Sequence, residues 1–285
     1  MSSPLLSPHE LDPLVRQALK EDISYGDVTS ETLIPSSTTT RAVIRAKQGV
    51  TVAGIPVLQK VFELLNHSVS ITVEHGDGET ILSGQTIATL EGNTRSILTG
   101  ERVALNFLQH LSGIATLTKQ YCDAVRDYPT KILDTRKTTP GLRTLQKWAV
   151  VMGGGTNHRM SLNDGILIKD NHLAILKAHG ISLTQACHLA RENGPHCVKI
   201  CVEIEALEEI EPAIQGQVDV LLLDNMTPDV VRKAVTQIKG RALVEASGGI
   251  TLANIREYAA AGTDYISIGA LTHSAPSVDL SLEIL

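Results

Sequence analysis

From residue 131 onwards the chain alternates short apolar runs with helical segments, and this alternation limits the fold more than any other feature. The apolar runs are KILD at 131–134, ILIKD at 166–170, VKICVEIE at 198–205, VDVLLLD at 218–224, ALVEAS at 242–247 and DYISIG at 264–269. Helical patterns follow the later runs, at 182–193, 206–214, 228–239 and 251–261. Strands that are apolar on both faces are typical of a parallel sheet covered by helices. About six strands are visible, fewer than the eight of a complete barrel. The sequence therefore predicts an α/β fold, an incomplete or distorted parallel α/β barrel.

The first part of the chain has a different order of expected helices and strands, which predicts a smaller N-terminal α+β sandwich domain. Its expected helices cover 8–21 and 56–66, and its expected strands cover 41–46, 69–74 and 85–91. A long helical run at 98–126 leads into the first apolar strand. We predict an N-terminal α+β domain over 1–112 and a barrel-like domain over 113–274. The tail, about 275–285, is expected to pack back on the N-terminal domain.

Composition excludes several functional classes. The net charge is -6 and aromatic residues make up 3% of the chain, which disfavours nucleic-acid binding by basic surfaces or stacked aromatic rings. No run approaches the roughly 20 apolar residues of a membrane span, so no membrane partner is expected. The first residues lack the pattern of a secretory signal, so a cytoplasmic location is expected. Cys197 and Cys201 with His188 and His196 do not have zinc-finger spacing, and reduced thiols are expected instead.

Against this acidic background, the region from Asp134 to His172 concentrates positive charge beside a Gly153–Gly155 run. It contains Arg136, Lys137, Arg143, His158, Arg159, Lys169 and His172. Cations gathered beside glycines and strand ends indicate a site for a small, highly charged anion. Solvated charges on a helix face are the alternative, but the glycine run is not typical of a charged helix.

The predicted strands end in residues suited to such a site. In α/β barrels the carboxyl ends of the strands carry the function. Glycines in the last two strand-to-helix turns, Ser247-Gly248-Gly249 and Ser267-Ile268-Gly269-Ala270, let the backbone approach a phosphate closely. Neither a P-loop nor a Rossmann glycine pattern is present. Glu203 and Asp224 fall on neighbouring strands and suit Mg²⁺, with acid–base pairing or salt bridges to lysines as alternatives.

These residues also carry a family resemblance. The segments DTRKTTPGLR, GGGTNHRMSLNDGILIKDNH, VEIEALEE, LLLDNM, EASGGI and DYISIGALTHSAPSVDLSLEI resemble quinolinate phosphoribosyltransferase, the carboxylating nicotinate-nucleotide diphosphorylase. EDISYGDVTS and GERVALNFLQHLSGIAT extend the resemblance over nearly the whole chain. It implies an enzyme, a glycosyltransferase that transfers the phosphoribosyl group of phosphoribosyl diphosphate to quinolinate. The implied products are nicotinate mononucleotide, CO₂ and diphosphate, in de novo NAD biosynthesis.

The resemblance also implies roles for individual residues. The quinolinate-binding positions are Arg102, Thr135, Arg136, Lys137, His158, Arg159 and Lys169. The positions for phosphoribosyl diphosphate are Lys137, Lys169, Glu203, Asp224, Ser247, Gly248, Gly249, Gly269 and Ala270. Catalytic roles fall to Lys137, Lys169, Glu203 and Asp224, and the two carboxylates would hold Mg²⁺ directly or through water. A homodimer, or a higher oligomer, is implied, with Arg102 contributed across the interface.

The expected chemistry is electrostatic, with no nucleophilic side chain. Three alternatives remain at this point. The first is the paralogous phosphoribosyltransferase-like family associated with molybdenum transport. The second is another phosphate-binding barrel enzyme, such as an aldolase or a thiamine-phosphate-type synthase. The third is a non-catalytic protein that binds phosphoribosyl diphosphate.

Overall fold

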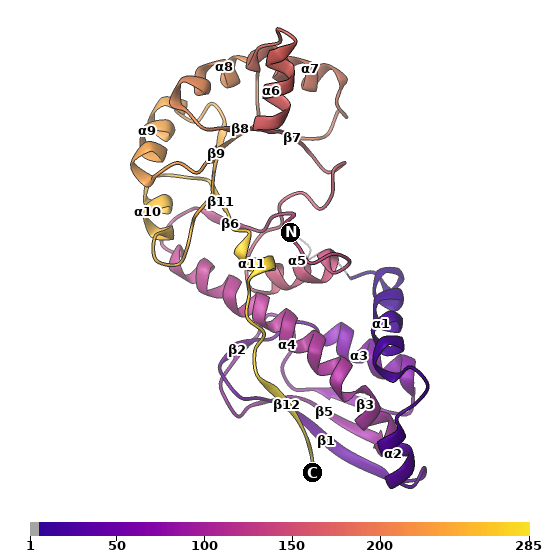
Figure 1. Ribbon diagram of the computed structural model, residues 1–285. Coiled ribbons are helices and arrows are strands. Elements are labelled where there is room, and N and C mark those ends of the chain that lie inside the picture. The colour runs from indigo at the N-terminus through magenta and orange to yellow at the C-terminus, as the bar shows by residue number, and fades with distance from the viewer. Residues whose placement is uncertain (1–5) are drawn as a thin grey trace. The chain divides into compact units, whose positions relative to one another are not determined.

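The computed structural model describes residues 6–285, which belong to two compact units (Figure 1). The first unit contains the chain up to residue 119, residues 138–154 and residues 270–285. The second contains residues 120–137 and 155–269. The two units therefore interleave along the chain, and α4 (Thr94–Ala124) begins in the first and ends in the second. In residues 6–285 no helix is long and apolar enough to cross a membrane.

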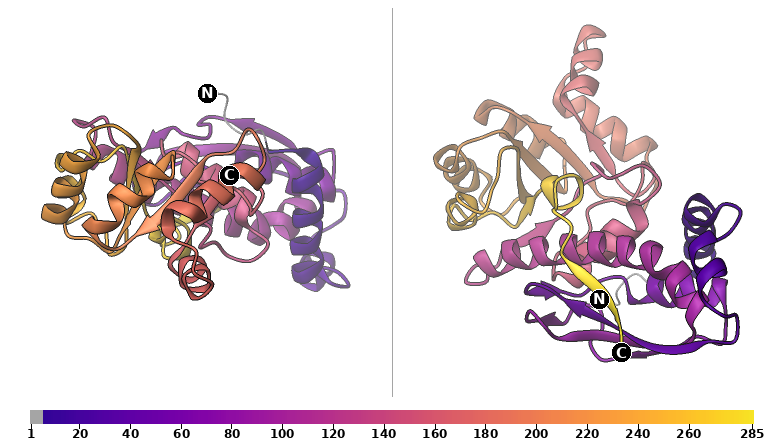
Figure 2. Two further views of the ribbon diagram at one scale, coloured as in Figure 1. Left: turned by 90° about the horizontal axis from the view of Figure 1, so that it is seen from above. Right: turned by 60° about the horizontal axis from the view of Figure 1, so that its bottom comes forward.

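The first unit is built on a four-stranded antiparallel sheet in the order β12-β1-β5-β3. These strands are β1 (Thr39–Ala46), β3 (Ser70–Val73), β5 (Thr86–Asn93) and β12 (Leu280–Ile284). A separate antiparallel pair is formed by β2 (Val50–Thr51) and β4 (Thr80–Ile81). The helices of this unit are α1 (Pro8–Ile23), α2 (Val28–Leu33), α3 (Ile55–Leu65), α5 (Arg143–Met152) and α11 (Ala270–His273). Figure 2 shows the sheet with α4 along one side of it, as expected for an α+β layer.

The C-terminal tail is held to this unit by backbone contacts. A Cβ added at Gly113 would lie 2.1 Å from the carbonyl oxygen of Pro276, so only glycine lets the tail pass this close to α4. The backbone N–H of Val278 then donates to the carbonyl of Gln109 at 3.1 Å. Beyond that point β12 pairs antiparallel with β1, with Ile44 opposite Leu282. The last residues of the chain therefore complete the first sheet.

The second unit is a ring of six parallel strands in the order β6-β11-β10-β9-β8-β7. The strands are β6 (Lys131–Leu133), β7 (Ile166–Ile168), β8 (Ile200–Ile204), β9 (Val220–Asp224), β10 (Leu243–Ser247) and β11 (Tyr265–Ser267). The chain visits neighbouring strands in succession, and the last strand, β11, pairs with the first, β6. The ladder is open between β6 and β7, where an isolated bridge joins Leu133 to Thr156. The predicted incomplete parallel barrel is thus confirmed.

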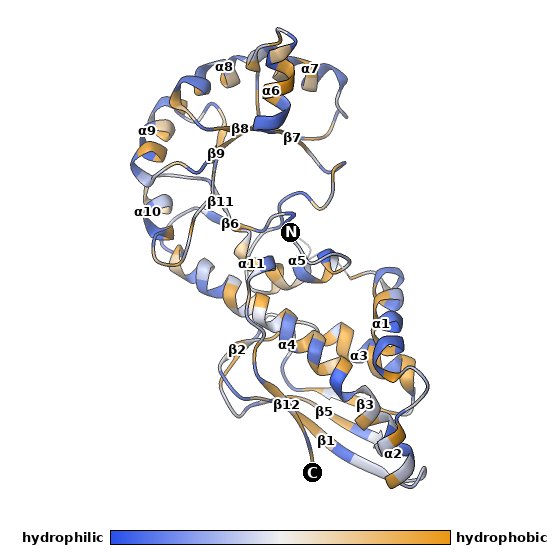
Figure 3. Ribbon diagram, viewed as in Figure 1, coloured by the Kyte–Doolittle hydropathy of each residue, from blue (hydrophilic) through white to orange (hydrophobic). Residues whose placement is uncertain are grey.

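Helices lie along the outside of this ring (Figure 1). They are α6 (Asp170–Ala178), α7 (Leu183–Asn193), the 3₁₀ turn η1 (Leu207–Glu209), α8 (Ile210–Gln215), α9 (Pro228–Ile238) and α10 (Ile255–Ala260). Helix α9 buries Val231, Ala234 and Ile238, which share one helical face, and Figure 3 shows apolar and hydrophilic residues mixed along these helices. Burial of such apolar faces is what holds helices to a sheet.

The two faces of each strand carry different residues, and this difference creates the site. Leu221 and Leu223 are fully buried on one face of β9. On the other face Val220 and Leu222 form an apolar cluster with Cys201, and Asp224 follows at the carboxyl end of the strand. Because side chains alternate along a strand, the inward face changes from apolar to polar as the strands end. All four cysteines are free thiols, as expected.

Candidate active site

A cavity of about 390 Å³ lies inside the second unit, toward the carboxyl ends of the strands. It is lined by Thr135, Arg136, Lys137, His158, Arg159, Leu167, Lys169, Glu203, Leu222, Asp224, Glu245, Ser247 and Ser267. Every strand of the ring contributes to this lining, directly or through the residues that follow it. Most of the lining was predicted from the sequence. The lining residues that were not predicted as site residues are Leu167, Leu222, Glu245 and Ser267, although Ser267 begins one of the two predicted glycine turns.

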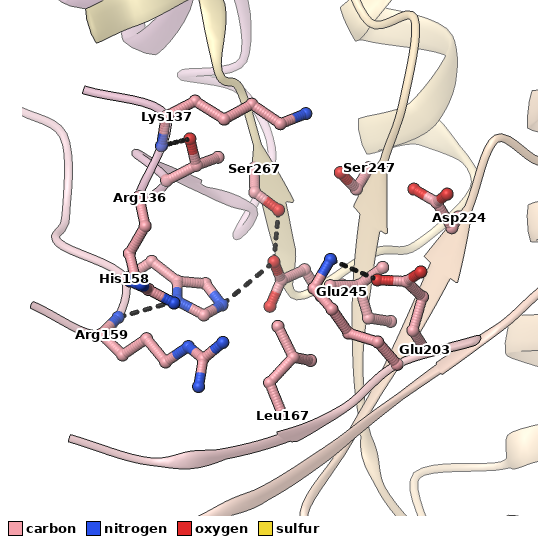
Figure 4. Close-up of a pocket in the computed structure, with 13 residues that line it drawn as sticks. Arg136, Lys137, His158, Arg159, Leu167, Glu203, Asp224, Glu245, Ser247 and Ser267 are labelled. Carbon is pink, nitrogen blue, oxygen red and sulfur yellow. Dashed lines mark hydrogen bonds and ion pairs between the residues drawn. The ribbon is translucent and has the colours of Figure 1, made fainter. Parts of the chain in front are cut away.

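One wall of the cavity is cationic (Figure 4). Arg136 and Lys137 follow β6, while His158 and Arg159 belong to the extended segment after Thr156. Burial lowers the pKa of Arg159, and repulsion from the nearby guanidinium of Arg136 lowers it further. Two guanidinium groups held this close to each other are stabilised by an anion placed between or beside them. Their planar forks suit carboxylates, which they can bind through two parallel hydrogen bonds.

Asp134 anchors this cationic segment. Its side chain is fully buried, and its Oδ1 accepts a hydrogen bond from the backbone N–H of His158 at 2.8 Å. Its Oδ2 accepts from the Asn157 side-chain amide at 2.5 Å. The carboxylate of Asp134 therefore fixes the backbone from which His158 projects.

The tautomer of His158 follows from its hydrogen bonds. Its Nδ1 accepts a hydrogen bond from the backbone N–H of Arg159 at 2.7 Å, so this nitrogen carries no proton. In the neutral ring the proton must then lie on Nε2. That nitrogen lies 3.6 Å from Oε1 of Glu245. His158 is thereby set to offer one N–H, from Nε2, to groups within the cavity.

Lys169 and Glu203 face each other across the cavity rim. Lys169 Nζ lies 3.3 Å from Glu203 Oε2, with the lysine side chain 46% exposed and the glutamate side chain 10% exposed. The backbone N–H of Lys169 donates to Nδ1 of His172 at 2.9 Å, which fixes the start of α6. His172 therefore positions Lys169 and does not itself line the cavity.

Glu245 lies deeper, in the middle of β10, and is only 3% exposed. Ser267 on the neighbouring strand β11 donates a hydrogen bond to its Oε1. Burial raises the pKa of Glu245 to about 7, and the hydrogen bond from Ser267 opposes this shift. The signal that could have identified it is the strand period of two, since Glu245 must face the same side as the predicted Ser247. Glu245 was not predicted because it lies two residues before the end of its strand.

The predicted glycine turns lie at the carboxyl ends of β10 and β11. Gly248 has φ +91°, and a Cβ there would lie 2.1 Å from Oδ1 of Asn225. The backbone N–H of Asn225 in turn donates to the carbonyl of Ser247 at 2.9 Å, so the turns after β9 and β10 fit closely together. Helix α10 begins only at Ile255, later than the predicted helix at 251. Gly248, Gly249, Gly269 and Ala270 do not line the cavity itself.

Two other predicted residues lie outside the cavity. Arg102 is exposed on α4 in the first unit and does not line the cavity. Arg143, from the cationic region, begins α5 and donates from Nε to the Thr138 hydroxyl at 3.1 Å. The chain therefore brings together Arg136, Lys137, His158, Arg159 and Lys169, but not every cation of that region.

Comparison with known proteins identifies the family. The model of the quinolinate phosphoribosyl transferase C-terminal domain matches residues 114–283, and that of the N-terminal domain matches residues 27–112. The chain belongs to the quinolinate phosphoribosyltransferase family. This membership agrees with the resemblance seen in the sequence motifs, and it covers both units of the structure.

Several members of this family are similar over their full length. The chain is 43% identical to the probable nicotinate-nucleotide pyrophosphorylase [carboxylating] of Synechocystis sp., over 96% of this chain and 92% of the relative. It is 42% identical to the corresponding Bacillus subtilis protein, over 96% of this chain and 93% of that one. The structure matches the nicotinate-nucleotide pyrophosphorylase of Francisella tularensis with a TM-score of 0.93 and 36% identity, covering 98% of each chain.

The cavity of this family member also has the donor set for a magnesium ion bound chiefly by its substrate. Glu203 and Asp224 both line it, and Asp224 Oδ2 accepts from the Asn225 amide at 2.7 Å. Residues 6–285 contain no cluster of three or more His, Cys, Asp or Glu side chains that could hold a metal. Mg²⁺ keeps several waters and is commonly held by one or two carboxylates together with substrate phosphates. The carboxylates of Glu203 and Asp224 fit that arrangement.

Proposed function

We infer that this chain transfers the phosphoribosyl group of phosphoribosyl diphosphate to quinolinate, with loss of CO₂ and diphosphate. The observation that carries the inference is the shared cavity, in which Arg136, His158 and Arg159 face Lys169, Glu203 and Asp224. Arg136, His158 and Arg159 suit a dicarboxylate. Lys169, Glu203 and Asp224 suit a phosphorylated sugar with its metal. A reaction that joins these two substrates needs both sets within one small volume.

Quinolinate carries two carboxylates on adjacent ring carbons, and the cationic wall can bind both. Arg136 and Arg159 offer planar guanidinium groups, and His158 offers its Nε2–H. Thr135 and Lys137 complete the quinolinate positions that we assign. Holding the ring in this way directs its nitrogen toward the sugar carbon C1, and an acceptor with a single carboxylate would be held less firmly.

The departing diphosphate would be neutralised by Lys137 and Lys169, whose ammonium groups supply fixed positive charge at the rim. When bound, Mg²⁺ would add charge neutralisation on the diphosphate oxygens, with Glu203 and Asp224 as its protein ligands, directly or through water. Ser247 and the turns at Gly248, Gly249, Gly269 and Ala270 are the positions that we assign to the 5′-phosphate. As the nitrogen becomes quaternary, the ring stabilises the electron pair left when the adjacent carboxylate departs as CO₂.

We further propose a homodimer, or a higher assembly of dimers, in which Arg102 completes the quinolinate site of the partner. Its exposure on α4, outside the cavity of its own chain, supports this assignment. The proposed compartment is the cytoplasm. The relatives' names favour this reaction over the molybdenum-associated, aldolase-type and sensor alternatives.

The direct test is an assay with quinolinate, phosphoribosyl diphosphate and Mg²⁺ that follows nicotinate mononucleotide and CO₂, with nicotinate in parallel. We expect product from quinolinate alone, and loss of product on chelation of the metal. Arg136→Ala should raise the quinolinate KM strongly and lower turnover, because loss of one desolvated charge partner costs about 2–5 kcal/mol. Product from nicotinate, or none from either acceptor, would overturn the substrate assignment, and Arg136→Ala with near wild-type kinetics would overturn the clamp.

A further inference from the structure

Glu245 is an acidic side chain in the cavity to which the proposed reaction has assigned no role. Besides the hydrogen bond from Ser267, two titratable groups among residues 6–285 lie near its carboxyl group: Nε2 of His158, 3.6 Å from Oε1, and the thiol of Cys201. No lysine or arginine of the described chain lies within ion-pair distance of its carboxyl group. An ionised carboxylate with so little compensation is costly to bury, so the protonated form is favoured.

The surrounding charges decide how this group behaves once substrate arrives. Arg159, Lys169 and Glu203 line the same cavity, so it holds charges of both signs. The thiol of Cys201, just below, has its pKa raised by burial and by Glu245 itself, so it stays neutral. A bound dicarboxylate would add two negative charges to the cavity. Burial already raises the pKa of Glu245 to about 7, and the substrate would raise it further.

The proposed reaction needs a proton at this place. Loss of CO₂ leaves an electron pair on the ring carbon next to the nitrogen, and that carbon must gain a proton to give the product. The arginines keep their protons throughout. His158 carries a single proton, on Nε2, and giving it up would leave an imidazolate. Lys169 is held at the rim by Glu203 at 3.3 Å, where its charge is needed for the phosphates.

We propose that the carboxyl group of Glu245 donates the proton that replaces CO₂ on the pyridine ring. This role rests on the proposed function. The bond between the ring carbon and its carboxylate breaks, CO₂ leaves, and the electron pair stays on the ring carbon. Until the ring carbon is protonated, its electron pair can recapture CO₂. The O–H bond of Glu245 breaks as the new C–H bond forms, and this proton transfer limits the net release of CO₂. Glu245 is left as a carboxylate, stabilised by Ser267, and takes up a proton from water before the next turnover.

The test separates the two chemical steps in a single turnover of the full-length protein. Diphosphate release reports transfer to the ring nitrogen, and CO₂ release reports the later step. In wild type both should appear together. Glu245→Gln keeps the size and a hydrogen-bond donor but has no acidic proton. We expect it to release diphosphate at close to the wild-type rate and CO₂ about 100-fold more slowly, since a general acid contributes at least that factor.

Controls make the outcome specific. Glu245→Asp retains an acid, and its rate of CO₂ release should be at least tenfold higher than that of Glu245→Gln. Glu257→Gln, on the exposed surface of α10, should release CO₂ at the wild-type rate. Ser267→Ala provides a second route if Glu245→Gln does not fold. It removes the hydrogen bond that favours the ionised carboxylate. The pH above which the rate of CO₂ release falls (the alkaline limb of its pH profile) should therefore be higher than in wild type.

Two results would overturn the proposal. One is CO₂ release by Glu245→Gln at the wild-type rate, and the other is an equal slowing of diphosphate and CO₂ release, which would indicate a structural role. An unmoved alkaline limb in Ser267→Ala would count against it as well. Failure of the proposed function is distinguishable, because wild type would then release no diphosphate with quinolinate.

Discussion

Oδ1 of Asp134 accepts a hydrogen bond from the backbone N–H of His158 at 2.8 Å, so a buried carboxylate at the end of β6 fixes the cationic wall. Asp134→Ala would remove the two carboxylate oxygens that accept from that N–H and from the Asn157 amide. We expect the free energy of unfolding to fall by about 2–6 kcal/mol, at about 1–3 kcal/mol for each of the two groups. The quinolinate KM should rise as the wall loosens. Denaturant titration and steady-state kinetics measure both effects, and unchanged stability would contradict the anchoring role.

Lys169 should matter for turnover although it is nearly half exposed. Its ammonium lies 3.3 Å from Glu203, and Lys169→Met removes the positive charge while keeping most of the side-chain volume. Because solvent screens this pair, we take the lower end of the range for charged partners, about 2 kcal/mol. This corresponds to a fall of about 30-fold in kcat/KM for phosphoribosyl diphosphate. Lys177→Met, on the same helix α6, is the matched control. Equal kinetics for the two variants would rule out the assigned role.

Gly248 offers a sharp test of the turn after β10. An alanine there would place its Cβ 2.1 Å from Oδ1 of Asn225, in a backbone with φ +91°. We expect the turn to move and the KM for phosphoribosyl diphosphate to rise at least tenfold. Gly240→Ala is the control, since φ is +71° there but a Cβ would meet nothing within 4 Å. Both variants pay the strain of a positive φ, so only the first should alter kinetics. A similar KM in both would remove this turn from the phosphate site.

The pH dependence of stability reports the state of Glu245 without any substrate. Its pKa is about 7 in the folded protein against 4.5 for the ordinary group, so the folded state binds the extra proton. The stability that this group contributes is present below pH 4.5 and is lost as the pH rises to about 7. The loss amounts to about 3 kcal/mol. The free energy of unfolding of Glu245→Gln minus that of wild type should therefore be larger at pH 8 than at pH 5. Melting curves at both pH values test this, and a constant difference would mean an ordinary pKa.

The sequence predicted the ring well because its signals are local. Each buried strand is a short apolar run, and β9 ends at Asp224 as the run VDVLLLD indicates. Helices α7 and α9 begin and end within one residue of the predictions, and Pro228 marks the start of α9. Helix α5 (Arg143–Met152) was not predicted, because Arg143 and Lys147 interrupt its apolar residues and a glycine run follows it.

The site was predicted in part for the same reason. Residues that end strands can be recognised one at a time, and seven of them or their neighbours line the cavity: Thr135, Arg136, Lys137, Lys169, Glu203, Asp224 and Ser247. His158 and Arg159 also line it, and they were predicted from the cationic region and the family resemblance. The link between Glu245 and Ser267 depends on the pairing of β10 with β11, which no local pattern records. The tautomer of His158 likewise depends on the backbone conformation at Arg159. Such relationships require the register of the sheet as well as the order of its strands.

The segment between β6 and β7 carries substrate-binding residues but contributes little to the strand pairing of the parallel sheet. The segment that carries His158 and Arg159 contributes one isolated bridge, Leu133 to Thr156, to the parallel ladder. The five continuous strand pairings of the ring do not pass through it. Changes of length or sequence in this segment can therefore alter which anion is accepted while leaving those pairings intact. Residues 157–164 are therefore the segment to replace in order to change which pyridine the enzyme accepts.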